Sequence, residues 1–142
     1  MDEKLRDFFK KEQVATLAVP IDREGSIHIA TMRCMTLLDP LKIYFVTGSS
    51  SEKCALLRTG ELIKTACEVG GYKGTEMYAQ MRGTARLWRL DEQPEIVKMY
   101  FEKRGEPNLK NEGDDSVLLE FTPDYLKYTD YAQGWDKHLV KL

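Results

Sequence analysis

Apolar and polar residues alternate over several short stretches of the chain, a pattern typical of half-buried β-strands. Residues 14–19 form an apolar, β-prone run, and Ile27, Ile29 and Thr31 alternate with their neighbours further along. Residues 22–25 lie between the two stretches and read DREG, which is the composition of a turn. The pattern therefore predicts a β-hairpin near the start of the chain.

Further strands are predicted after the turn at Asp39 and Pro40. They are expected at residues 41–46, 61–69, 76–88 and 116–131. Gly83 lies inside one of them, where a glycine often marks a β-bulge or a barrel corner. Pro123 interrupts the last segment, which is expected as one long strand or as a pair.

Short helices are predicted beside these strands. Residues 2–12 place Leu5, Phe8 and Phe9 on one helical face, and Asp2 can cap the start. Residues 51–59 are expected to form a second helix that ends at Gly60.

A third helix is expected to begin at Asp91 and to end at Gly105 and Pro107. Its apolar face carries Ile96, Met99 and Tyr100. Residues 70–74 and 108–115 have the composition of loops, and residues 133–142 show no clear pattern. About six mostly consecutive strands with short helices predict a mainly β fold, a small antiparallel barrel, as one domain over residues 1–142.

The composition of the chain argues against several classes of function but identifies none. The chain has 142 residues and a net charge of -2, so no strong field favours nucleic acid or an anionic membrane surface. The three cysteines show no C-x-x-C spacing, which indicates free thiols in a reducing compartment. Without a signal peptide or an apolar run of membrane-spanning length, a cytoplasmic protein is expected.

The first candidate binding residues follow the predicted apolar strand 41–46. It runs into Thr47, Ser49 and Ser51, and Lys53 falls in the first turn of the predicted helix. Free N–H groups, a helix dipole, hydroxyls and one ammonium would then suit a phosphate. On these residues alone a plain capping box, Ser49-x-x-Glu52, explains the same pattern.

The order of the motifs extends this picture. Thr31-Met32-Arg33-Cys34 ends one strand, Thr47 ends the next, the Ser–Lys turn follows, and Gln80-Met81-Arg82-Gly83 lies on a later strand. This order resembles the pyridoxamine 5'-phosphate oxidase-like family of FMN-binding split barrels, over roughly residues 5–131. The resemblance implies a six-stranded antiparallel split β-barrel and a homodimer with two flavin sites at its interface.

The resemblance also implies roles for individual residues. Arg33 would pair with the FMN phosphate, while the backbone of Met32 and Cys34 would face the flavin ring. Thr47, Ser49, Ser51 and Lys53 would surround the phosphate with hydroxyls and charge. Tyr78 and Gln80 would contact the flavin, although their alternation also fits ordinary strand packing. Glu52 stands where the family often has a second base.

Alternatives stay open for several of these residues. Arg33 could be a surface residue paired with Asp39 or a glutamate. Cys34 could be a reactive thiol beside Arg33, or a small buried residue. His28 and His138 come with no metal-binding motif, so no metal site is expected, and no catalytic residue is identified.

The resemblance implies an FMN-dependent oxidoreductase that moves electrons between a reduced nicotinamide and an unidentified small substrate. Oxidation of vitamin B6 is not expected, because Thr129 occupies the position of a family Trp and residues 130–142 lack the family's arginine run. The alternatives are a non-catalytic flavin-binding or sensing module and a relative that binds deazaflavin or haem. A cofactor-free dimer would use the aromatic residues Tyr125, Tyr128, Tyr131 and Trp135.

Overall fold

The computed structural model describes residues 1–71, 77–105 and 115–142. Its elements are α1 (Glu3–Lys11), β1 (Val14–Pro20), β2 (Ile27–Arg33), β3 (Met35–Leu38), β4 (Leu41–Gly48), β5 (Ile63–Gly70), β6 (Met77–Arg89), α2 (Pro94–Lys103), β7 (Ser116–Asp130) and β8 (Asp136–Val140). Short 3-10 turns lie at Glu52–Cys54, Leu57–Thr59, Leu90–Glu92 and Tyr131–Gln133. Among the described residues, no helix combines the length and apolar character needed to cross a membrane.

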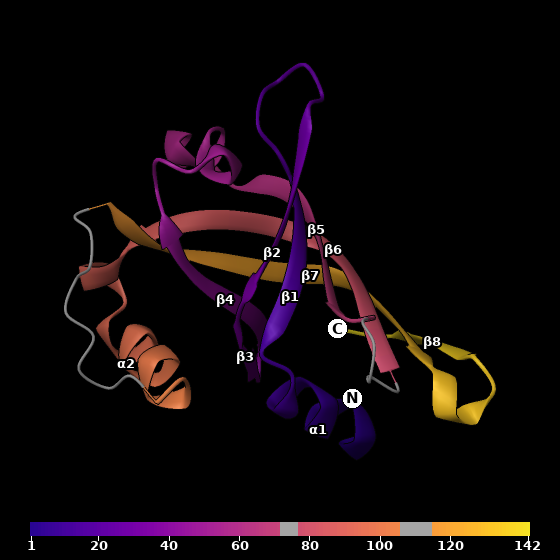
Figure 1. The fold of residues 1–142 in the computed structure, drawn as a ribbon. Coiled ribbons are helices and arrows are strands. Elements are labelled where there is room, and N and C mark those ends of the chain that lie inside the picture. Colours follow the sequence, from indigo (N-terminus) through magenta and orange to yellow (C-terminus); the bar gives the residue numbers. More distant parts are fainter. Residues whose placement is uncertain (72–76, 106–114) are drawn as a thin grey trace.

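One antiparallel sheet organises the fold (Figure 1). The strand order is β2-β1-β5-β6-β7-β4-β3, and β8 pairs with β7 off this path. The long strands β6 and β7 curve through the centre of the molecule and join the two ends of the sheet. The mainly β, antiparallel architecture that the alternating pattern predicted is therefore confirmed.

The concave side of the sheet holds the main core. Leu5, Phe8 and Phe9 of α1 pack there against inward side chains such as Leu17 and Phe45, as the helical periodicity predicted. A second, smaller cluster lies where α2 covers the other side of the sheet. It contains the buried residues Met35, Tyr44, Tyr100, Phe101 and Leu118. Helix α1 therefore covers the concave face of the curled sheet, and α2 covers part of the opposite, outer face. The rest of the outer face is open.

A β-bulge between β6 and β7 determines which side chains point to that open face. Arg82 pairs with Tyr125 but Gly83 pairs with Pro123, so Asp124 is the extra residue. Inward positions on β7 therefore change from odd numbers before the bulge to even numbers after it. A Cβ on Gly83 would lie 2.0 Å from the carbonyl oxygen of Thr122, which explains the glycine. The predicted bulge is confirmed, and it also accommodates Pro123 inside an unbroken strand.

Several predicted elements differ from the structure. Strands β3 and β8 were not predicted, so the described sheet has eight strands instead of six. Residues 51–59 form two 3-10 turns and no α-helix. Met99 is 39% exposed, since Tyr100 and Phe101 supply the buried face of α2. Most of the predicted loops 70–74 and 108–115 lies outside the described residues.

Candidate functional site

The open outer face carries two rows of side chains that run across five strands. The register aligns Thr31, Thr16, Glu68, Gln80 and Lys127 in one row. The neighbouring row contains Ile29, Ala18, Ala66, Arg82 and Tyr125. One row is therefore polar, and the other passes from an apolar end at β2 to a cationic, aromatic end at β6 and β7.

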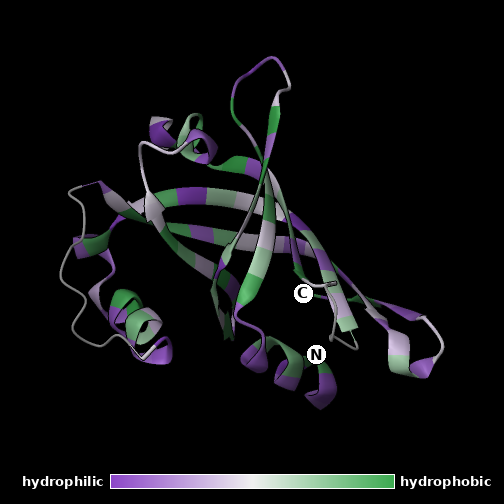
Figure 2. Cartoon of the chain, in the orientation of Figure 1, coloured by the Kyte–Doolittle hydropathy of each residue, from purple (hydrophilic) through white to green (hydrophobic). Residues whose placement is uncertain are grey.

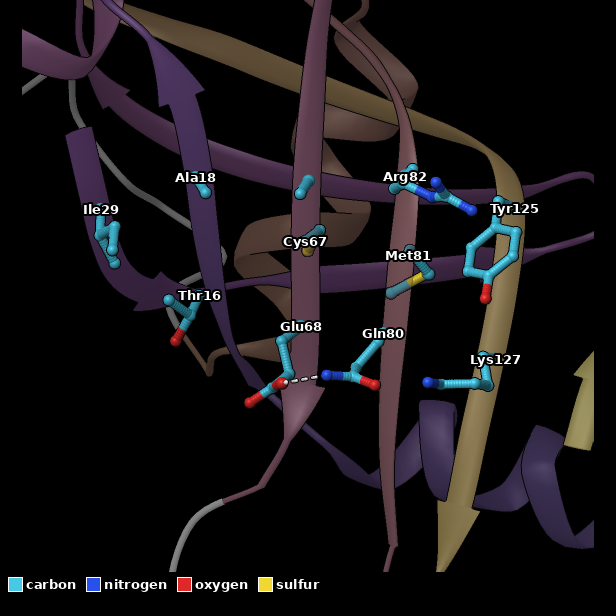
Figure 3. Close-up of a pocket in the computed structure, with 11 residues that line it drawn as sticks. Thr16, Ala18, Ile29, Cys67, Glu68, Gln80, Met81, Arg82, Tyr125 and Lys127 are labelled. Carbon is cyan, nitrogen blue, oxygen red and sulfur yellow. Dashed lines mark hydrogen bonds between the residues drawn. The ribbon is translucent and has the colours of Figure 1, made fainter. Parts of the chain in front are cut away.

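A groove forms along these rows because the residues at its centre are small. Ala18 and Ala66 provide a low floor between Ile29 on one side and Arg82 with Tyr125 on the other. The groove has a volume of about 490 Å³ (Figure 3). A second hollow of about 530 Å³ adjoins it and shares Ala18, Ala66, Arg82 and Tyr125. Both volumes fall in the range of small-molecule sites, about 300–1,000 Å³.

Several side chains that line this groove are held in place by contacts with one another. The guanidinium of Arg82 lies 3.9 Å from the centre of the Tyr125 ring. The hydroxyls of Thr16 and Thr31 lie 2.9 Å apart and share a hydrogen bond. Gln80 donates from Nε2 to the Glu68 carboxylate at 3.5 Å, so this predicted flavin contact lies within the groove.

The predicted residues Thr47, Ser49, Ser51 and Lys53 lie together at the end of β4 and in the turn that follows. Lys53 donates from Nζ to the Ser51 hydroxyl at 3.1 Å, and Ser51 donates to the Gly48 carbonyl at 2.7 Å. Arg58 donates to the Ser49 carbonyl at 2.5 Å, which holds the turn from the other side. An ammonium and a hydroxyl therefore converge in a turn that the chain itself keeps in shape.

The prediction that an α-helix begins at this turn is wrong. Only the 3-10 turn Glu52–Cys54 follows Ser51, and Ser51 makes no side-chain cap. Ser49 donates its N–H to the Asp115 carbonyl and Ser50 donates its hydroxyl to the Asp115 carboxylate at 2.6 Å. Any anion bound here is therefore held by Lys53 and hydroxyls, and a helix dipole contributes little.

Strand β2 connects this turn to the groove. His28 Nδ1 lies 3.7 Å from the Glu52 carboxylate, next to Lys53. His28 stands between Ile27 and Ile29, which line the two hollows on the outer face. Because neighbouring side chains of a strand point to opposite faces, the Ser–Lys turn and the groove lie on opposite faces of the same edge strand.

The third predicted set, Met32, Arg33 and Cys34, lies at the far end of β2. Five residues separate Arg33 from His28, which is about 16 Å along a strand. Arg33 is exposed there, and its carbonyl accepts a hydrogen bond from the Tyr100 hydroxyl at 3.2 Å. Asp39 binds Arg6 at 2.8 Å, so a pair between Arg33 and Asp39 is not formed. The structure does not bring Arg33 to Lys53.

The side chains that flank Arg33 belong to the core. Met32 is half-buried and packs against the main core, and Cys34 is 3% exposed. Burial raises the pKa of the Cys34 thiol to about 12, so a reactive thiolate at this position is contradicted. Cys54 and Cys67 are buried as well, as expected.

Tyr78, the remaining predicted contact, lies two residues from Gln80 on the outer side of β6. Its ring centre is 5.3 Å from that of Tyr131, which in turn is 4.5 Å from Trp135. Trp135 is 64% exposed and adopts a positive φ of 68°. Tyr78 therefore joins an aromatic cluster beyond the polar row of the groove.

Sequence reasoning missed most of the groove. Thr16, Glu68 and Lys127 carry no motif, and they become neighbours only through the strand order and register. Tyr125 was named only as one of four aromatic residues that could form a dimer surface. Arg82 belonged to a quoted motif but had no assigned role. Among the described residues, no group of three His, Cys, Asp or Glu side chains is arranged to hold a metal ion.

No family model matches the chain, and no curated protein sequence matches it. Solved structures do match. A protein of unknown function, Atu2129 from Agrobacterium tumefaciens str. C58, superposes with a TM-score of 0.73 at 12% identity over 92% of this chain and 58% of that one. This chain thus spans less than two thirds of the Atu2129 chain.

Two further structures match over nearly their whole length. A protein related to general stress protein 26, described with the pyridoxinephosphate oxidase family and from Clostridium acetobutylicum, gives a TM-score of 0.67 at 14% identity, over 100% of this chain and 97% of that one. An F420 reductase gives 0.65 at 15% identity, over 89% and 98%. Identities this low establish the fold alone, and the chain has the pyridoxamine 5'-phosphate oxidase-like split-barrel fold, as its motif order predicted.

Proposed function

We propose that this protein binds FMN as a homodimer and moves electrons between a reduced nicotinamide and a small acceptor. The observation that carries the proposal is the pair formed by Lys53 and Ser51 at 3.1 Å, in a turn that shares strand β2 with the groove. The phosphate site and the ring site would then lie on opposite faces of one edge strand, and bound FMN would extend around that edge. Structural similarity to an F420 reductase and to a member of the pyridoxinephosphate oxidase family supports the same class of ligand.

The phosphate of FMN is assigned to Lys53, Ser51 and Thr47. The Lys53 ammonium has three N–H donors and uses one on Ser51. The Ser51 hydroxyl would turn from the Gly48 carbonyl toward a phosphate oxygen. Glu52 adds a nearby negative charge, so the site holds a dianion less strongly than one with a second base would.

The flavin ring is assigned to the groove. Ala18 and Ala66 leave a shallow apolar floor on which a flat ring can lie, and Gln80 offers an amide at its edge. Bound FMN supplies the electron-transfer chemistry, and the chain's part is to orient the ring and to exclude water. Glu68 accepts a hydrogen bond from Gln80, which holds that amide in place.

A second copy of the chain would complete the site. Ile27 and Ile29 on the edge strand β2 are 64% and 67% exposed, and both line the hollows. Apolar side chains this exposed beside a groove are typical of an interaction surface. Covering them with a symmetric partner would shield a ring in the groove from water. Sedimentation of the protein with and without an Ile29→Lys substitution tests this part, with a shift from dimer to monomer expected.

A non-catalytic flavin or deazaflavin module is the second candidate. The similarity to an F420 reductase favours a deazaflavin as its ligand. A groove in which no catalytic nucleophile and base are paired among the described residues favours a binding role. Anaerobic titration with NADH or NADPH separates the two. Rapid bleaching of the bound flavin supports the enzyme, while an unchanged spectrum supports the binding module.

The decisive experiment is retention of FMN. Purified protein is mixed with excess FMN, desalted, and its absorbance spectrum compared with that of free FMN. Retained and shifted flavin bands are expected. Lys53→Ala should weaken binding about 10- to 100-fold, because it removes a charge-assisted hydrogen bond of about 1.5–3 kcal/mol.

Lys98→Ala is the matched control, since Lys98 is exposed on α2 and its ammonium lies 4.0 Å from the Glu102 carboxylate. Its FMN affinity should equal that of the wild type. No retained flavin in the wild-type protein would reject FMN as the ligand. Equal affinities of Lys53→Ala and Lys98→Ala would reject the assignment of the phosphate to this turn.

A further inference from the structure

Two cationic side chains lie at the end of the groove that is farther from β2. Arg82 on β6 and Lys127 on β7 both line the groove, and neither forms an ion pair within the described part of the chain. The two are diagonal neighbours, since Lys127 follows two residues after Tyr125, the partner of Arg82. Diagonal neighbours are about 7–8 Å apart at the backbone, so two long side chains can reach one anion.

Tyr125 orients the first of these cations. The guanidinium of Arg82 lies over the Tyr125 ring at 3.9 Å (Figure 3), and it donates no hydrogen bond to another described residue. A stacked guanidinium loses less conformational freedom on binding an anion than a free one, because its plane is already held. The ammonium of Lys127 extends from β7 toward β6 in the same view.

Two carboxylates border the two cations, and neither forms an ion pair with Arg82 or Lys127. Glu68 on β5 is a diagonal neighbour of Arg82, and it accepts a hydrogen bond from Gln80. Asp124 lines the second hollow together with Arg82 and Lys64. Three cations and two carboxylates therefore line the two hollows, so this surface has a net charge of +1, although the whole chain has a net charge of -2.

Apolar surface continues from these cations toward β2. Ala66, Ala18 and Ile29 follow Arg82 in the same row, so a ligand with an anionic head would lay its body over them when FMN is absent, and against the flavin ring when FMN is bound there. This arrangement fits a small molecule that combines a carboxylate or phosphate with a flat apolar part.

We propose that Arg82 and Lys127 form an anion-binding subsite that selects an acceptor with a carboxylate or phosphate group. As an acceptor subsite it rests on the proposed function, because the flavin would occupy the part of the groove next to β2. Binding of the anion itself rests only on the two cations and the groove. An anion could also come from the phosphate of FMN, and the experiment separates these sources.

The test uses benzoate and its neutral analogue benzamide as probes, followed by ligand-observed NMR. Wild-type protein should bind benzoate at least tenfold more tightly than benzamide, with and without saturating FMN. Arg82→Gln and Lys127→Gln should each weaken benzoate binding at least tenfold and leave FMN retention unchanged. Lys98→Gln on α2 is the matched control and should bind benzoate like the wild type.

Three results would overturn the subsite. They are equal binding of benzoate and benzamide, benzoate affinity that Arg82→Gln leaves unchanged, and displacement of benzoate by FMN together with weaker FMN retention in Arg82→Gln. The last would assign these cations to the FMN phosphate. If the wild type retains no FMN but binds benzoate through Arg82, the proposed function fails and the subsite stands.

Discussion

The imidazole Nδ1 of His28 lies 3.7 Å from the carboxylate of Glu52, and this contact joins the edge strand β2 to the turn that carries Lys53. It places the turn at the edge strand that borders the groove, on the face of β2 opposite to Ile29. It also places a carboxylate next to the proposed phosphate site. Glu52 is 65% exposed at its side chain, so this charge acts mostly through water.

Glu52→Gln should therefore bind FMN more tightly than the wild type. A carboxylate about 6 Å from a phosphate dianion costs about 1.4 kcal/mol in water at low salt, so its removal should improve the affinity about tenfold. Titration of flavin fluorescence at low salt measures the change, which should shrink as salt is added. Glu95→Gln on α2 is the control. Weaker FMN binding by Glu52→Gln would instead mean that its contact with His28 positions the turn.

Gly83→Ala should destabilise the fold strongly. The new Cβ would lie 2.0 Å from the Thr122 carbonyl oxygen and 2.7 Å from Cα of Pro123, both backbone atoms of β7. We expect a loss of about 3 kcal/mol in the free energy of unfolding. Urea unfolding followed by tryptophan fluorescence measures it.

Gly25→Ala is the matched control for that substitution. Gly25 has a φ of 95° but no atom within 4 Å of an added Cβ, so only backbone strain of roughly 1–2 kcal/mol is expected. Equal losses in the two variants would show that the close approach at the bulge relaxes easily.

The sequence predicted the parts of the fold that depend on local pattern. Alternation located β1 and β2, the helical face of Leu5, Phe8 and Phe9 located α1, and a single glycine located the bulge. Strand β3 was missed because its four residues show little alternation, and β8 because its residues are nearly all exposed. Residues 51–59 were mistaken for a helix because a capping pattern also fits a 3-10 turn.

The candidate site was predictable only where its residues are close in the sequence. Ser51 and Lys53 are two residues apart, and their contact follows from that spacing. Arg82 and Lys127 are neighbours only because β6 pairs with β7 and the bulge reverses the alternation of β7. Cross-strand register is a property of the fold, so no motif could have indicated this part of the groove.

The three cysteines should be unreactive in the folded protein. All are buried, and burial raises the pKa of Cys34 to about 12 and that of Cys67 well above its usual value. Ellman's reagent at about pH 8 should therefore label no thiol in native protein within minutes and all three in urea. Rapid labelling of Cys34 in the native state would show that the end of β2 opens.

Asp2→Ala should lower stability at neutral pH but not in acid. Asp2 caps α1 by accepting a hydrogen bond from the Leu5 N–H at 2.9 Å, and it accepts a second from Tyr128. These bonds, the backbone one first, hold the pKa of Asp2 below its ordinary value of 3.8. The contribution of the carboxylate is therefore complete above about pH 4 and is lost as the pH falls through the lowered pKa.

The expected loss for Asp2→Ala is about 1 kcal/mol at neutral pH, the usual value of an N-cap. Urea unfolding between about pH 3 and pH 7 should show the curves of the wild type and the variant converging on the acid side. Asp2→Asn is the control, because asparagine also caps helices, and its stability should stay near that of the wild type at neutral pH. A gap that stays constant with pH would show that the charge of Asp2 plays no part.

Arg33→Ala should change FMN affinity less than threefold, in contrast to Lys53→Ala. Arg33 lies about 16 Å along β2 from His28, so a phosphate held by Lys53 does not reach it within one chain. Parallel FMN titrations of the two variants and of the double variant measure the difference. The double variant should match Lys53→Ala, because only one residue contacts the phosphate. A loss in Arg33→Ala as large as that in Lys53→Ala, together with a dimer in solution, would instead assign Arg33 to the flavin site of the second copy.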